Sequence, residues 1–167
     1  MRRTILLVGA MLAAPIMVSA AAWAATTIHC PNDPLHIGGG TCWGTKGDDV
    51  LIGTDGRNEI NASFGDDLVR AGPGSDFISN GESDYSFGED ENHGGQGADY
   101  IVGQLDSEQH FGGPGDDHIV DYKSGKNLDV IRCGAGRDDV TYNKGLDRVA
   151  ADCEVLHPAS KDMVASH

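Results

Sequence analysis

The residues of this sequence whose types and spacing could do chemistry are aspartates that follow glycines at a fixed interval. Two segments show the pattern: GGQGADYIV at 94–102 and GGPGDDHIV at 112–120. In each, an aspartate, Asp99 or Asp117, stands five residues after the first glycine. Carboxylates beside a glycine-rich turn are hard oxygen ligands that suit a cation and repel phosphate. The sequence has no GxxxxGK[ST] motif, so we expect a cation site and not a phosphate-binding loop.

Both segments belong to a nine-residue repeat. Three gapless blocks, 44–79, 85–120 and 124–150, hold four, four and three units, eleven in all. The short segments Asn80–Asp84 and Asp121–Lys123 separate the blocks. Position 4 is glycine, position 6 is aspartate and position 8 is aliphatic in nine of the eleven units each. A fixed period of this kind predicts a solenoid, in which each unit stacks on its neighbours.

The units resemble the GGxGxDxUx nonapeptides of RTX (hemolysin-type) calcium-binding repeat proteins. The matching residues run from Gly44 to Ala150. The resemblance implies a β-roll fold, bound Ca²⁺ and secretion by a bacterium.

The physical properties of the unit lead to the same architecture. Glycines at positions 1, 2 and 4 allow positive φ, and positions 7 to 9 form a short strand. Two units then make one coil with a strand on each side, and the position 8 side chains meet inside, as Val69 does with Ile60 and Ile78. We therefore expect an all-β fold, a parallel β-roll or β-solenoid of about eleven nonapeptide units with disulfide-closed ends.

Position 6 supplies the candidate metal ligands. Its carboxylates recur one coil apart, where strands stack about 4.8 Å from one another, so they repel unless a cation lies between them. Ca²⁺ suits them better than Mg²⁺, because it accepts six to eight oxygen ligands in irregular geometry. Binding would then contribute to folding, because the unfolded chain has no preformed site. The predicted ligands are Asp99, Asp117, Asp49, Asp67, Asp76, Asn58, Asp129, Asp147, Asp90 and Asp138, with backbone carbonyls around Gly94, Gly95, Gly97, Gly112, Gly113 and Gly115.

The candidate sites differ in quality. Asp99 with Asp117 is the best pair, because both turns match the repeat fully. Asp90 with Glu108 is a poorer pair, since Asp106 and His110 replace the glycine and the aliphatic residue of that unit. His93, His110 and His118 fall at positions 9, 8 and 7 of different units, so we expect surface or packing roles for them and no shared Zn or Cu site.

The N-terminus has the features of a secretory signal peptide. Arg2 and Arg3 precede an almost wholly apolar run, and Ala22-Trp23-Ala24 fits a cleavage site. The alternative is an N-terminal membrane anchor. Without residues 1–24 the chain has 10 basic and 26 acidic residues, a formal net charge of −16. That charge argues against a nucleic-acid partner, and we expect a secreted, extracellular protein with calcium ions as partners.

Four cysteines follow the leader, an even number that favours two disulfides in an exported chain. Sequence alone allows three pairings, of which we favour neighbours, Cys30–Cys42 and Cys133–Cys153. A zinc site is the alternative, but no CxxC motif is present. The predicted organisation is a signal peptide at 1–24, an N-terminal cap at 25–43, the roll with its C-terminal cap at 44–156, and a disordered tail at 157–167.

The sequence indicates a calcium-binding structural or interaction module and not an enzyme. Neither HExxH nor GxSxG occurs, and few residues lie outside the repeats. Two alternatives stay open. One is a solenoid whose calcium sites have decayed and which serves as a structural or adhesive surface. The other is an accessory of a secreted enzyme or toxin.

Overall fold

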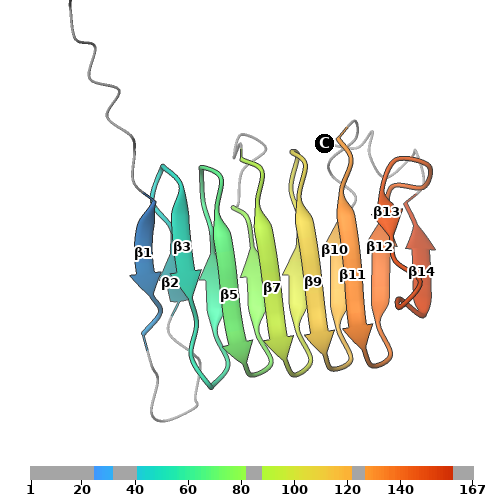
Figure 1. Cartoon of the computed structure of the whole chain (residues 1–167), viewed down its shortest axis with the longest axis horizontal. Helices are drawn as coiled ribbons and strands as arrows, with labels where there is room; N and C mark the ends of the chain where they lie inside the picture. Colours follow the sequence, from blue (N-terminus) through green and yellow to red (C-terminus); the bar gives the residue numbers. More distant parts are fainter. Residues whose placement is uncertain (1–24, 32–40, 82–87, 122–126, 160–167) are drawn as a thin grey trace, which may run out of the picture.

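The computed structural model describes residues 25–31, 41–81, 88–121 and 127–159. These residues form two parallel sheets of seven strands each (Figure 1). The odd sheet contains β1 (Thr26–His29), β3 (Asp49–Ile52), β5 (Leu68–Pro73), β7 (Glu91–Gln96), β9 (Gln109–Pro114), β11 (Val130–Ala135) and β13 (Arg148–Val149). The even sheet contains β2 (Thr41–Trp43), β4 (Glu59–Asn61), β6 (Phe77–Ser79), β8 (Tyr100–Val102), β10 (His118–Asp121), β12 (Asp139–Tyr142) and β14 (Val155–Pro158). None of the described segments contains a helix that could cross a membrane.

The chain alternates between the two sheets, so an odd strand and the following even strand make one coil. The predicted all-β parallel solenoid is confirmed, and its coils stack along the long axis of the molecule (Figure 1). Turns that lead from an odd to an even strand lie at the lower edge in Figure 1, and we call them lower turns. Turns that lead from an even to an odd strand lie at the upper edge and are called upper turns. Both extra segments of the repeat, after β6 and after β10, belong to upper turns.

The core is a double column of aliphatic side chains at position 8. Leu51, Val69 and Ile131 point inward from the odd sheet and are fully buried, as are the residues of the even sheet. These even-sheet residues are Ile60, Ile78, Ile101, Ile119 and Val140. The odd column is interrupted by two fully buried polar residues, Asn92 and His110, which lie in register between Val69 and Ile131.

Four odd strands are twice as long as the three residues that the repeat predicts. β5, β7, β9 and β11 each run for six residues, because the first residues of the lower turn stay in the ladder. Gly72 pairs with Gly95, and Gly134 pairs with Gly113. The lower turns are therefore stacked on one another by backbone hydrogen bonds as well as by the strands.

Both ends of the solenoid carry a disulfide, and the predicted pairings are confirmed. Cys30–Cys42 joins the segments that hold β1 and β2, the first strand of each sheet. Cys133–Cys153 joins β11 to the turn before β14. The C-terminal strand also extends further than expected: β14 includes His157 and Pro158, which we had assigned to a disordered tail, because they pair with β12. Residues 1–24 and 160–167 lie outside the described part of the chain.

Candidate metal centre

A row of polar side chains follows the lower turns, one at each coil. This lower row consists of Asn58, Asp76, Asp99, Asp117, Asp138 and Glu154. The backbone N–H of each member donates to a side-chain oxygen of the next member, with N···O distances of 2.6–2.9 Å. The extra segments do not break the row, since Asp76 bonds to Asp99 across 23 residues and Asp117 to Asp138 across 21.

Each aspartate of the lower row uses only one carboxylate oxygen in these bonds. The Oδ2 atoms are buried and have no hydrogen-bond partner in Asp76, Asp99, Asp117 and Asp138. A buried charged oxygen without a partner costs several times more than an ordinary hydrogen bond returns. A row of such atoms, all of one sign and one chemistry, fits oxygen ligands that face a cation.

Glycine at position 1 lets the backbone lie close to the carboxylates of Asp99 and Asp117, where a side chain would collide. A Cβ atom built on Gly94 would lie 2.8 Å from the carbonyl oxygen of Gly112 and still closer to Asp99 Oδ2. A Cβ atom on Gly112 would lie 2.7 Å from the carbonyl oxygen of Cys133 and closer to Asp117 Oδ2. A carboxylate oxygen and a carbonyl oxygen of the next coil therefore lie close together beside Gly94 and again beside Gly112. Ca²⁺ binds such oxygens at about 2.3–2.6 Å.

The predicted carbonyls of the lower turns have different positions. The carbonyl of Gly112 faces the space beside Asp99, as described above. The carbonyls of Gly95 and Gly97 approach the Cα atoms of Gly113 and Gly115 on the next coil, where any side chain would collide. The glycines at positions 2 and 4 thus serve close packing between coils, and position 1 borders the candidate site.

Burial without a counter-ion makes the carboxylates of the lower row weak acids. Desolvation raises the pKa of Asp99 to about 6 and that of Asp117 to about 7, although the backbone N–H bonds oppose the change. The negative charges of neighbouring row members add to the rise for both residues. Ionised carboxylates are therefore unfavourable here unless positive charge is supplied.

A second row follows the upper turns and is less regular. This upper row consists of Asp49, Asp67, Asp90, Glu108, Asp129 and Asp147. The N–H of Asp49 donates to Asp67 (2.8 Å), and the N–H of Asp67 donates to Asp90 (2.9 Å). Asp67 Oδ2 and Asp129 Oδ2 are again buried without a partner. Desolvation raises the pKa of Asp67 to about 7 and that of Asp90 to about 8.

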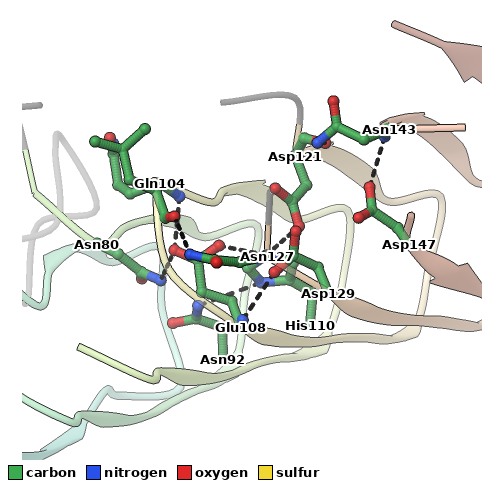
Figure 2. Close-up of polar contacts among 11 residues, drawn as sticks. Asn80, Asn92, Gln104, Glu108, His110, Asp121, Asn127, Asp129, Asn143 and Asp147 are labelled. Carbon is green, nitrogen blue, oxygen red and sulfur yellow. Dashed lines mark hydrogen bonds and ion pairs between the residues drawn. The ribbon is translucent and has the colours of Figure 1, made fainter. Parts of the chain in front are cut away.

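The upper row changes character at Glu108. The side chain of Glu108 folds back onto its own turn, where Oε1 accepts the N–H of Gln104 (2.6 Å) and the Nδ2 of Asn80 (3.3 Å) (Figure 2). Its own N–H donates to Asp129 (2.9 Å), so the row resumes on the next coil. Desolvation raises the pKa of Glu108 to about 8 and lowers that of His110 beside it.

Three polar residues near the rows, Glu154, Asp121 and His110, do not follow the repeat pattern. Asp138, which the frame leaves without a full partner turn, donates its N–H to Glu154, 16 residues on and outside the frame. Asp121 lies in an extra segment, yet it is fully buried beside Asp129 and Asp147. His110 was expected to have a surface or packing role, and it faces Asp121 in the interior. The register offered one clue: Asp121, the last residue of β10, is aligned with Gly103, which follows β8.

The fold defines a protein of the parallel β-roll class, built of nonapeptide coils with oxygen-lined turns. Within it, four copies of the RTX calcium-binding nonapeptide repeat match residues 43–78 and 86–119. RTX nonapeptide repeats bind calcium ions, and this chain contains them. The match includes the lower turns of Asp76, Asp99 and Asp117, whereas the block at 124–150 continues the same coils beyond it. No curated protein and no solved structure matches the chain.

Proposed function

We propose that this chain is a secreted, extracellular β-roll that folds on binding Ca²⁺ between successive coils and serves as a structural or interaction module. The observation that carries the proposal is the lower row, in which buried Asp99 and Asp117 each accept an N–H of the neighbouring coil with Oδ1 and leave Oδ2 beside a glycine without a hydrogen-bond partner. Asp99 with Asp117 is the proposed primary site, and the other predicted position 6 residues supply further sites.

The small size of the hydrophobic core supports a role of Ca²⁺ in folding. The core offers one aliphatic side chain per nine residues, and burying it contributes about 1.5–3 kcal/mol. Ordering nine residues costs on the order of 10 kcal/mol. Ladder hydrogen bonds narrow this difference, and metal binding adds free energy that the unfolded chain cannot obtain. Secretion agrees with two disulfides and with calcium at millimolar concentration outside cells.

Circular dichroism and calorimetry test this proposal. The reduced calcium-free chain is expected to lack the β signal, and the oxidised chain is expected to gain it between chelator and about 1 mM Ca²⁺. Mg²⁺ at the same concentration serves as the control and is expected to have little effect. Identical spectra in chelator and in Ca²⁺ would contradict calcium-coupled folding. They would favour the second candidate function, a solenoid with decayed sites, for which the turned-away side chain of Glu108 is the supporting observation.

A further inference from the structure

A compact polar cluster interrupts the aliphatic core where the upper row changes character. Its members are Glu108 and His110 of the β9 coil and Asp121 at the end of β10, and each is at most 1% exposed (Figure 2). His110 Nε2 lies 3.3 Å from Asp121 Oδ2 and 3.8 Å from Glu108 Oε2. One ligand atom from each residue can be chosen so that all three lie within 4.8 Å of one another.

The atoms that face one another in this cluster have no hydrogen-bond donors. Glu108 Oε2, His110 Nε2 and both carboxylate oxygens of Asp121 are buried without a partner. A hydrogen bond from His110 to Asp121 would satisfy one oxygen and leave Glu108 Oε2 and the second oxygen of Asp121 unpaired. The start of β9 and the end of β10 thus direct unsatisfied ligand atoms to the same place, which is rare in a folded interior.

Gly103 lies directly against the three ligand residues, where any side chain would collide with them. A Cβ atom built there would lie 2.8 Å from Glu108 Oε2, 2.8 Å from His110 Nε2 and 3.1 Å from Asp121 Cγ. Two ligands of a tetrahedral Zn²⁺ lie about 3.4 Å apart, given bond lengths near 2.1 Å. The 3.3 Å and 3.8 Å separations in the cluster bracket this value.

Hydrogen bonds from surrounding residues hold the side chains of Glu108 and His110, each of which offers one ligand atom to the metal. The bonds from Gln104 and Asn80 fix Glu108 through Oε1 and leave Oε2 directed at His110. The amide of Asn92 lies 3.3 Å from His110 Nδ1. Rotation of that amide presents its oxygen to an Nδ1–H group, which leaves the lone pair of Nε2 for a metal.

We propose that Glu108, His110 and Asp121 form a binding site for a divalent transition-metal ion of the zinc class, separate from the calcium sites. The imidazole nitrogen decides the class: Ca²⁺ and Mg²⁺ take oxygen ligands, whereas imidazole suits Zn²⁺ and its neighbours. The site does not rest on the calcium proposal, because none of its ligand atoms belongs to the lower row. Asp121 also borders Asp129 and Asp147, so it lies between this site and the last pair of the upper row.

Metal titration in calcium-saturated buffer tests the proposal. The oxidised chain is expected to bind one high-affinity Zn²⁺ by isothermal titration, and Co²⁺ in its place is expected to give visible absorption bands from a nitrogen–oxygen site. His110→Val restores the aliphatic column, so the fold should persist, and Zn²⁺ affinity should fall by at least about 100-fold. Asp121→Asn keeps the shape of the side chain and should weaken Zn²⁺ binding in the same direction.

His118→Ala is the matched control, since His118 is an exposed histidine with its own carboxylate neighbour, Asp139, at 3.8 Å. This variant should bind Zn²⁺ like the wild type. Equal Zn²⁺ affinity and equal Co²⁺ spectra in the wild type and His110→Val would overturn the proposal. So would a wild type that takes up no Zn²⁺, which would leave His110 hydrogen-bonded to Asp121. Calcium-dependent circular dichroism of each variant is read in parallel, so a loss of folding is distinguished from a loss of zinc.

Discussion

A position 6 aspartate divides its two oxygens between folding and binding. In the pair Asp99 and Asp117, one oxygen of Asp117 accepts the N–H of Asp99, and the other faces the space beside Gly112. The first contact sets the register between coils, and the second provides the ligand. An amide side chain in place of the carboxylate could make the first contact but would carry no charge for the second.

The residue scale therefore yields a prediction with isosteric substitutions. Asp117→Asn keeps an acceptor for the Asp99 N–H and removes one negative charge from two neighbouring sites, so calcium affinity at these sites should fall about tenfold or more. Glu108→Gln should change calcium affinity much less, because Glu108 Oε1 is already bonded to Gln104 and Asn80. Isothermal titration with Ca²⁺ measures both. Equal losses of calcium affinity in the two variants would contradict the prediction that Asp117 is a stronger calcium ligand than Glu108.

At the scale of elements, the repeat pattern predicted the strands and turns but not every partner. The period of 18 residues per coil placed Asp99 beside Asp117, because every coil of that length returns to the same edge. The pairing of Asp76 with Asp99 across an extra segment was not foreseen; the strands on either side keep their register although more residues separate them. A fixed spacing along the chain predicts partners only where every coil has the same length.

The polar cluster escaped prediction for a different reason. His110 was judged from its position 8 alone, and histidines at different positions were expected to face different directions. The structure brings His110 to Asp121 because Asp121, the last residue of β10, is fully buried and faces His110 of β9. This contact joins residues from two half-coils and depends on side-chain direction, which spacing along the chain does not determine.

Glycines of the lower turns provide the prediction at this scale. Gly113 has φ of 116°, and a Cβ atom there would collide with the carbonyl oxygen of Gly95. Gly113→Ala should therefore lower the unfolding free energy by about 2 kcal/mol or more. Gly56 occupies a turn where a Cβ atom meets nothing within 4 Å, so Gly56→Ala should stay within about 0.5 kcal/mol of wild type. Thermal denaturation in saturating Ca²⁺ compares them, and equal losses would refute the role of close coil packing.

On the scale of the whole molecule, negative charge opposes the stacking of coils. The chain has a formal net charge of −14, and two rows of carboxylates run along its two edges. The electrostatic repulsion between carboxylates is spread evenly along a solenoid, since each coil contacts only its neighbours. The disulfides close the two end coils, which have a neighbour on one side only. The stability of the interior then depends on what neutralises the rows.

Protons can neutralise the rows when calcium is absent, and this gives a pH dependence of defined sign. Burial raises the folded-state pKa values of four aspartates to about 6–7, well above the value of 3.8 for an exposed aspartate; these are Asp67, Asp76, Asp99 and Asp117. A raised pKa means that the folded chain binds protons more tightly than the unfolded chain. The free energy of unfolding should then be highest at low pH and be lost as pH rises toward 7 and beyond.

The folded fraction of the calcium-free, oxidised chain, followed by circular dichroism between pH 5.5 and pH 8, measures this dependence and should fall as pH rises. In saturating Ca²⁺ the trend should vanish or reverse, because binding to carboxylates releases protons and strengthens as pH rises. Repulsion between surface charges would also weaken toward low pH, so the series is repeated in about 0.5 M NaCl, where screening shortens the reach of exposed charges to a few ångströms. Buried carboxylates are screened far less. A pH dependence that disappears in high salt would assign the effect to the surface and contradict a role of the buried rows.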